Sequence, residues 1–110
     1  MDIKIRTVEQ IVVVELDGKI DSKTAPQVQA QISPLVQRGS RIVLDMTGVT
    51  YMSSAGLRLL VAAHRQVADS NGKLALAGLA ERVRDTMSIT GFLPFFTIYD
   101  TVQAALAALK

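Results

Sequence analysis

Short apolar segments alternate along this chain with segments of helical periodicity, and no other feature constrains the fold as strongly. Residues 11–16 (IVVVEL) and 41–46 (RIVLDM) are almost continuously apolar and rich in β-branched side chains. Such segments are typical of strands that are covered on both faces. Residues 73–78 (KLALAG) and 96–100 (FTIYD) are further candidate strands, each preceded by a helical segment. Strands that alternate with helices predict parallel βαβ units.

One more strand is expected at the amino-terminal end of the chain. Residues 3–7 (IKIRT) alternate between apolar and polar side chains, which is typical of a strand with one exposed face. Only a short connection separates this segment from residues 11–16, so the two are predicted to form an antiparallel hairpin. The first strand would then lie at the edge of the sheet.

The ends of two helices are marked by particular residues. Thr24 and Gln27 have the spacing of a capping box, so a helix is expected to begin there. Pro34 is expected to kink or end that helix, because its ring clashes with the preceding turn. Asp100, together with Gln103, is expected to cap a helix at the carboxyl-terminal end of the chain.

Two further helices, over residues 57–69 and 80–89, bring the predicted number to four. The fold class expected is therefore α/β, with one domain spanning residues 1–110. We predict a mixed sheet of four or five strands in roughly sequential order. The helices should lie mainly on one face, because crossover connections of one hand that advance steadily across a sheet stay on the same side.

Composition limits the chemistry that this chain can perform. Hydrophobic residues make up 49% of the 110 residues and charged residues 20%, which is typical of a globular domain and not of a disordered chain. The sequence has no cysteine, which excludes disulfides and thiolate chemistry, and a single histidine, His64. We expect no metal site, because one imidazole cannot build a site that requires two. No cofactor is expected either.

Charge and hydropathy indicate where the chain acts. The 12 basic and 10 acidic residues are interspersed, so no patch for nucleic acid or an anionic membrane is expected. Uninterrupted apolar runs such as Leu59–Ala63 are far shorter than the roughly 18 residues of a membrane span, and the first residues do not resemble a signal peptide. We therefore expect a cytoplasmic protein.

No motif predicts an enzyme. The chain lacks both glycine-rich phosphate-binding patterns and the GxSxG pattern of serine hydrolases. Asp17, Asp21 and Asp45 could in principle support acid–base chemistry, but aspartate commonly occupies turns and strand ends for structural reasons. We therefore expect no catalytic residues, and a nucleotide hydrolase using Asp21 and Asp45 is the weakest of the hypotheses considered.

One segment, Asp45–Leu57 (DMTGVTYMSSAGL), is not explained by structural needs alone. It is expected to run from the end of a strand through a short loop into a helix, with Ser53 and Ser54 at the helix start. One hydroxyl can serve as the cap. Gly56 in the first turn costs up to about 1 kcal/mol relative to alanine, but it allows another backbone to approach closely. A phosphate on a serine there would meet free N–H groups and the positive end of the helix dipole.

These residues carry a resemblance to a known family. Residues 49–60 (VTYMSSAGLRLL) resemble the signature of STAS domains of the anti-sigma-factor antagonist family. Residues 16–28 (LDGKIDSKTAPQV), 42–49 (IVLDMTGV) and 96–106 (FTIYDTVQAAL) resemble other parts of that family in the same order. The resemblance covers nearly the whole chain, and it implies a STAS-like fold.

The resemblance implies a switch controlled by reversible serine phosphorylation. In this family the dephosphorylated form binds a serine kinase of the GHKL ATPase type, the anti-sigma factor. That kinase phosphorylates the serine of the signature, and a PP2C-type phosphatase removes the phosphate. The acceptor falls on Ser54. Because the family usually has aspartate where this chain has Ser53, Ser53 remains the alternative acceptor.

The resemblance implies that residues around the acceptor contact the partner. These are Asp21, Tyr51, Met52, Ser53, Gly56 and Arg58. The chain is expected to be a monomer when alone. Tyr51 and Met52 could anchor a partner or pack inward, and Asp21 could contact the partner or shape its loop. The alternative hypothesis is a STAS module that serves as a scaffold or subunit of another signalling or transport assembly.

Overall fold

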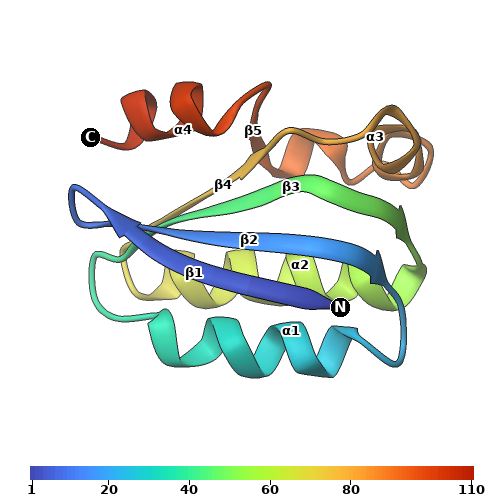
Figure 1. Cartoon of the computed structure of the whole chain (residues 1–110), viewed down its shortest axis with the longest axis horizontal. Coiled ribbons are helices and arrows are strands. Elements are labelled where there is room, and N and C mark those ends of the chain that lie inside the picture. Colours follow the sequence, from blue (N-terminus) through green and yellow to red (C-terminus); the bar gives the residue numbers. More distant parts are fainter.

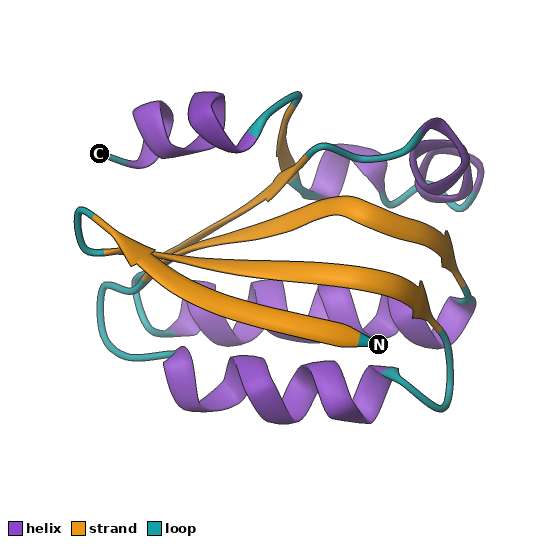
Figure 2. Ribbon diagram, in the orientation of Figure 1, coloured by secondary structure: helices purple, strands orange, loops and turns teal.

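The computed structural model describes the whole chain, residues 1–110, as one five-stranded sheet with helices on both faces (Figures 1 and 2). The strands are β1 (Asp2–Val8), β2 (Ile11–Ile20), β3 (Arg41–Met52), β4 (Lys73–Ala77) and β5 (Thr97–Tyr99). The α-helices are α1 (Ala25–Ile32), α2 (Ser54–Asp69), α3 (Glu81–Ile89) and α4 (Val102–Leu109). Two 3₁₀ turns, η1 (Ser33–Leu35) and η2 (Leu93–Phe95), follow α1 and precede β5.

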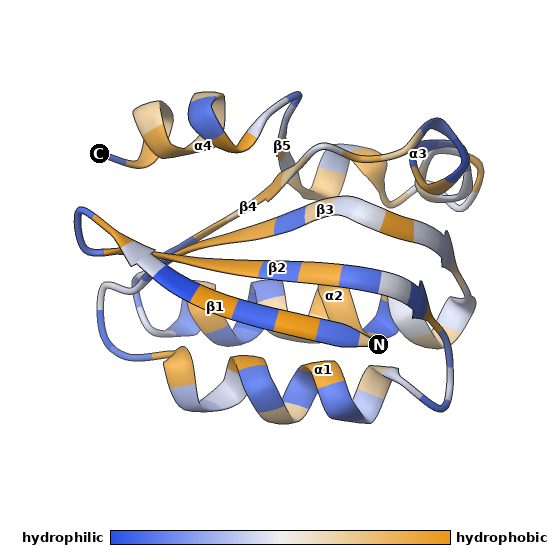
Figure 3. Ribbon diagram, viewed as in Figure 1, coloured by the Kyte–Doolittle hydropathy of each residue, from blue (hydrophilic) through white to orange (hydrophobic).

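The strands lie in sequential order, β1-β2-β3-β4-β5, as the sequence predicts. β1 is antiparallel to β2, and every other neighbouring pair is parallel. The predicted hairpin and the edge position of β1 are thus confirmed. Figure 3 shows the alternation of hydrophobic and hydrophilic residues along this edge strand. None of the helices is both long enough and apolar enough to cross a membrane.

Alternation of side chains along the inner strands divides the core into two clusters. Leu44 and Leu76 point to the face that carries the larger cluster, to which α1, α2 and α3 contribute, whereas Val43 and Ala77 point to the opposite face. Only α4 covers that second face. The helices therefore lie mainly on one side because α1, α2 and α3 each connect two parallel strands. The helix α4 follows the last strand, so no such connection restricts it.

Two strands are longer than their apolar segments suggest. β2 and β3 continue in parallel as far as the pair Ile20 and Met52, past two register shifts that follow Glu15 and Gly18. The expected loop before α2 is therefore wrong, since only Ser53 separates the strand from the helix. The sequence conceals this extension because backbone hydrogen bonds continue through polar residues that interrupt the apolar pattern.

The predicted capping box before α1 is also wrong. The Thr24 side chain makes no capping bond. Its hydroxyl instead donates to the Lys19 carbonyl oxygen at 2.7 Å and accepts from the Asp21 N–H at 2.9 Å. The Thr24 side chain therefore links residues within the loop between β2 and α1 and does not cap the helix. A sequence pattern does not distinguish the two roles because both use the same side-chain oxygen.

The predicted end of α1 is confirmed, whereas the predicted cap of α4 is wrong by one residue. α1 ends at Ile32, and Pro34 lies in the 3₁₀ turn that follows, so the expected early end is confirmed. The cap of α4 is Thr101 and not Asp100, since the Thr101 side chain accepts from the Ala104 N–H at 3.1 Å. The error is one residue, and both residue types are good caps.

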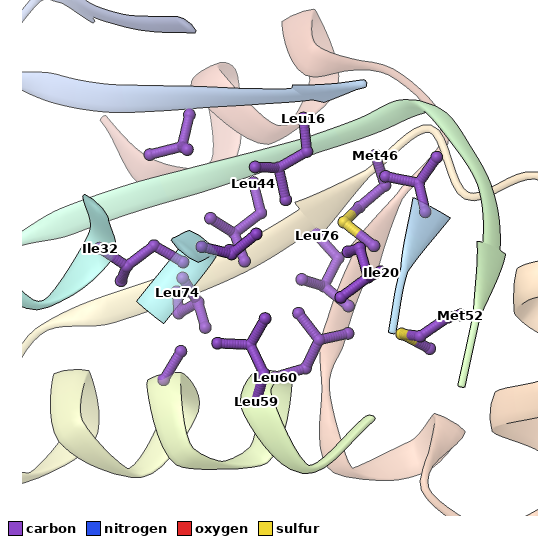
Figure 4. Close-up of a cluster of buried hydrophobic side chains, with 14 of the residues drawn as sticks. Leu16, Ile20, Ile32, Leu44, Met46, Met52, Leu59, Leu60, Leu74 and Leu76 are labelled. Carbon is purple, nitrogen blue, oxygen red and sulfur yellow. The ribbon is translucent and has the colours of Figure 1, made fainter. Parts of the chain in front are cut away.

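Burial at the helix ends gives a direct test of this core. Ile32 ends α1 fully buried (Figure 4), and Ile89 ends α3 at 86% exposure. We expect Ile32→Ala to lower the free energy of unfolding by about 2–5 kcal/mol, because it leaves a cavity in the larger cluster. The matched variant Ile89→Ala should change it by less than about 0.5 kcal/mol. Urea unfolding measures both, and equal losses would contradict the packing described.

Candidate functional site

The site predicted from the sequence lies where three elements meet: the ends of β2 and β3 and the start of α2 (Figure 1). The Ser53 N–H donates to the carbonyl oxygen of Ile20 at 2.9 Å, one residue beyond the last pair of the two strands. This bond joins the start of α2 directly to β2. The carboxyl ends of parallel strands thus carry the candidate site, as is usual in open α/β sheets.

The two neighbouring serines have different structural roles. Ser53 has an extended backbone and is the N-cap of α2: its Oγ accepts from the Gly56 N–H at 3.4 Å and its carbonyl oxygen from the Leu57 N–H at 3.0 Å. Ser54 is the first residue of the helix. Its side chain is exposed, and its hydroxyl makes no hydrogen bond within the chain. The N–H groups of Ser54 and Ala55 also have no partner within the chain.

Gly56 holds the helix against the strands. A Cβ atom at this position would lie 2.8 Å from the Ile20 carbonyl oxygen and 2.6 Å from the Met52 Cγ. The close approach of another backbone, predicted from the glycine, is therefore confirmed. Gly56 is buried, so the expectation that it contacts a partner is corrected. Its lack of a side chain allows the start of α2 to lie against the end of β2.

Met52 needs the same correction. Its side chain is 2% exposed and belongs to the larger core cluster (Figure 4), whereas its neighbour Tyr51 is 41% exposed. Successive residues of a strand point to opposite sides, so one of the two must turn away from the core. Of this pair only Tyr51 remains available as a surface contact, together with the exposed Arg58 on α2.

Asp21 shapes the loop that precedes α1. Its Oδ1 accepts from the N–H groups of Lys23 at 2.9 Å and Thr24 at 3.1 Å. These two N–H groups, that of Thr24 first, hold the pKa of Asp21 below its ordinary value. The carboxylate is therefore ionised at neutral pH. Asp21 follows Ile20, whose carbonyl oxygen accepts from the Ser53 N–H, so the loop of Asp21 adjoins the start of α2.

A groove beside Ser54 contains residues that sequence reasoning missed. It has a volume of about 540 Å³ and lies between α2 and the segment that follows α3. Its lining consists of Ser54, Leu57, Arg58, Val61, Ala62, Arg65, Thr90 and Phe92. The sequence feature that could have indicated this groove is the largely apolar segment ITGFLPFF (residues 89–96), most of which belongs to no predicted strand or helix.

Residues weighed for other chemistry have local structural roles. The Asp45 carboxylate accepts from the N–H and the hydroxyl of Thr47, at 3.1 and 2.6 Å. His64 packs against the rings of Phe95 and Phe96, with centroids 4.6 and 5.6 Å away. No group of three or more histidine, aspartate or glutamate side chains is placed to hold a metal ion.

Comparison with known proteins agrees with this fold and site. The family model described as STAS domain matches residues 2–105. BtrV of Bordetella bronchiseptica is 33% identical over 111 residues, covering 100% of this chain and 96% of its own. The anti-sigma-B factor antagonist of Bacillus subtilis is 30% identical over 91 residues, covering 83% of this chain and 84% of its own.

A solved structure supports the same assignment. The crystal structure of an anti-sigma factor antagonist from Mycobacterium paratuberculosis superposes with a TM-score of 0.88 at 26% identity, covering 98% of this chain and 92% of that chain. The chain therefore belongs to the STAS domain family. The resemblance drawn from the sequence motifs, to STAS domains named as anti-sigma factor antagonists, is confirmed.

The division of roles between the two serines can be measured. We expect Ser53→Ala to lower the free energy of unfolding by about 0.5–1 kcal/mol, because it removes the cap; the bond of 3.4 Å favours the lower part of the usual range. Ser54→Ala should leave stability nearly unchanged. Chemical denaturation of both variants checks this, and a larger loss at Ser54 would reverse the assignment of the cap.

The role of Gly56 is testable in the same way. In an open helix a change from glycine to alanine stabilises by about 1 kcal/mol. Gly56→Ala should instead destabilise by about 1–3 kcal/mol, because the new methyl group meets a backbone carbonyl that cannot move aside. The exposed Ala62 on the same helix gives the control. Ala62→Gly should lower the free energy of unfolding by the ordinary cost of a glycine in a helix, about 1 kcal/mol. A stabilising Gly56→Ala would show that the contact with Ile20 is loose.

Proposed function

We propose that this chain is an anti-sigma factor antagonist that works as a binding switch controlled by phosphorylation of Ser54. Its partner is a GHKL-type serine kinase that is itself the anti-sigma factor, and a PP2C-type phosphatase restores the binding form. Because the kinase consumes ATP, we place this cycle in the cytoplasm. One observation carries the proposal: Ser54 presents an exposed hydroxyl, free of hydrogen bonds, at the start of a 16-residue helix.

The same geometry favours Ser54 over Ser53 as the acceptor. The Ser53 hydroxyl is engaged with the Gly56 N–H and its side chain is only half exposed. Phosphorylation of Ser53 would replace the group that caps α2. Ser54 can be modified without the loss of any bond within the chain, so the domain can be phosphorylated and dephosphorylated repeatedly in its folded state.

Within the domain, a phosphate at Ser54 is expected to be tolerated well. It would carry a charge of about −1.5 to −2 at neutral pH. The N–H groups of Ser54 and Ala55 have no other partner and point out of the helix start, where the dipole favours negative charge. The fold is therefore expected to change little on phosphorylation.

At an interface the same charge has the opposite effect. The new dianion would stand on the exposed side chain of Ser54 and would lose its hydration when a partner covers it. It would also add to the negative charge of Asp21 nearby. A penalty of about 3 kcal/mol changes an affinity by more than 100-fold, so local electrostatics is sufficient to release the partner.

The test incubates the purified chain with ATP and with the purified GHKL-type kinase that is encoded in the same genome. Mass spectrometry should find one phosphate per chain, and peptide mapping should place it on Ser54. Ser54→Ala should bind the kinase but resist phosphorylation. Ser54→Asp should bind more weakly than the wild type, but the loss should be only partial, because one carboxylate carries less charge than a phosphate. Both variants should keep the unfolding midpoint of the wild type within a few degrees.

Two outcomes would contradict this proposal. Phosphate on Ser53, or on neither serine, would overturn the assignment of the acceptor. Equal kinase affinity for the wild type and Ser54→Asp, at matched stability, would indicate that the domain binds without being switched. That result would favour a scaffold or subunit role in another assembly.

A further inference from the structure

The groove beside Ser54 has a regular construction along α2. The residues that α2 contributes recur at intervals of three and four, so they form one stripe over three turns of the helix. At about 1.5 Å per residue, the stripe from Ser54 to Arg65 is roughly 16 Å long. Thr90 and Phe92 form the opposite wall. A straight, open groove of this length matches the side of another helix.

The lining is apolar along its floor and cationic at two points. Leu57, Val61 and Phe92 supply the apolar surface, and the neighbouring Ile89 is 86% exposed. Apolar side chains gathered at the surface mark an interaction site more often than a free surface.

Both charged residues of the lining, Arg58 and Arg65, lack a partner within the chain. The lining contains no acidic residue. The one ion pair of the molecule joins Lys110 to Glu9, with 3.2 Å between Nζ and Oε2. The two guanidinium groups are therefore free to pair with carboxylates that come from outside.

We infer that this groove binds an amphipathic helix of the partner kinase that presents apolar side chains to Val61 and Phe92 and carboxylates to Arg58 and Arg65. The inference rests on the proposed function for the identity of the partner, but its geometry and charge come from the groove alone. The two arginines are seven residues apart, roughly 10 Å along α2. The two carboxylates are therefore expected about seven residues apart on the partner helix.

The position of Ser54 connects this groove to the switch. Ser54 lies at one end of the lining and Arg58 lies one turn further along the same helix face. A phosphate on Ser54 would repel the nearer carboxylate of the bound helix and compete with it for Arg58. Arg65, about three turns from Ser54, would be unaffected. Release would thus begin at the end of the groove next to the acceptor.

The first measurement is the affinity of the chain for the purified kinase by isothermal titration calorimetry. Arg65→Glu should weaken binding by about 10-fold or more at low salt, and the difference should shrink at high salt, because the carboxylate loses its partner and meets a like charge. Arg38→Glu is the matched control: it makes the same change of charge at an exposed position outside the groove lining, in the loop between α1 and β3, which lies at the end of the domain opposite Ser54 (Figure 1). It should leave the affinity unchanged.

A second pair of variants tests the shape of the groove. Ala62→Trp should fill the groove and weaken binding by about 10-fold or more, whereas Ala107→Trp, on the exposed side of α4, should have no effect. Thermal unfolding of all four variants separates these effects from loss of the fold. If Ala62→Trp instead converted a dimer of the chain into a monomer in sedimentation, the occupant would be a second copy and the inference would be wrong.

The occupant itself can be identified by cross-linking. A photoreactive amino acid placed at Ala62 should capture a kinase peptide that forms an amphipathic helix with acidic residues about seven apart. Replacing one of those acids with lysine should restore the affinity for Arg65→Glu. A basic or uncharged peptide, or no rescue by any of these lysine variants, would overturn the inference.

The two proposals fail in distinguishable ways. Kinase that binds the chain and phosphorylates Ser54, with unchanged affinity for Arg65→Glu and Ala62→Trp, would overturn the groove and leave the switch intact. Kinase that neither binds nor phosphorylates the wild-type chain would overturn both.

Discussion

The contact between Gly56 and the end of β2 is the constraint on which the rest of the site depends. A side chain at position 56 would meet the carbonyl oxygen of Ile20, and the same oxygen accepts the N–H of Ser53. Because both contacts involve backbone atoms, α2 cannot slide or rotate without losing a hydrogen bond or creating a clash. The direction in which Ser54 faces the solvent is therefore fixed by backbone geometry and not by its own side chain.

This arrangement separates two tasks that adjacent hydroxyls could otherwise share. Ser53 completes the helix start, and Ser54 stays free of bonds within the chain. The packing that supports both lies beneath them, in Met52 and the larger core cluster. A charge added at Ser54 would act on whatever covers the surface, since no contact within the domain needs to break. The groove that begins at Ser54 extends this surface to Phe92, in the segment after α3, so partner recognition would involve residues far from the acceptor in sequence.

Much of this fold could be predicted from local patterns, and the failures share a cause. The strand order, the hairpin and the end of α1 before Pro34 follow from apolar periodicity and proline chemistry, which act over a few residues. The length of β3 could not be predicted, because pairing with β2 continues past Thr47, Gly48 and Thr50, which interrupt the apolar pattern. The role of Thr24 failed for a related reason: its hydroxyl had several possible partners close by, and the path of the loop selected among them.

Sequence patterns alone predict the class of fold, the position of the serine pair at a helix start, and the need for a glycine in the first turn. Each of these depends on backbone preferences and periodicities that one segment expresses alone. The folded structure was needed to establish which serine is the cap, that Met52 faces the core while Tyr51 does not, and that Arg65 and Phe92 border the same groove as Ser54. These features depend on how distant segments pack, and the burial of a side chain is a property of its neighbours in space.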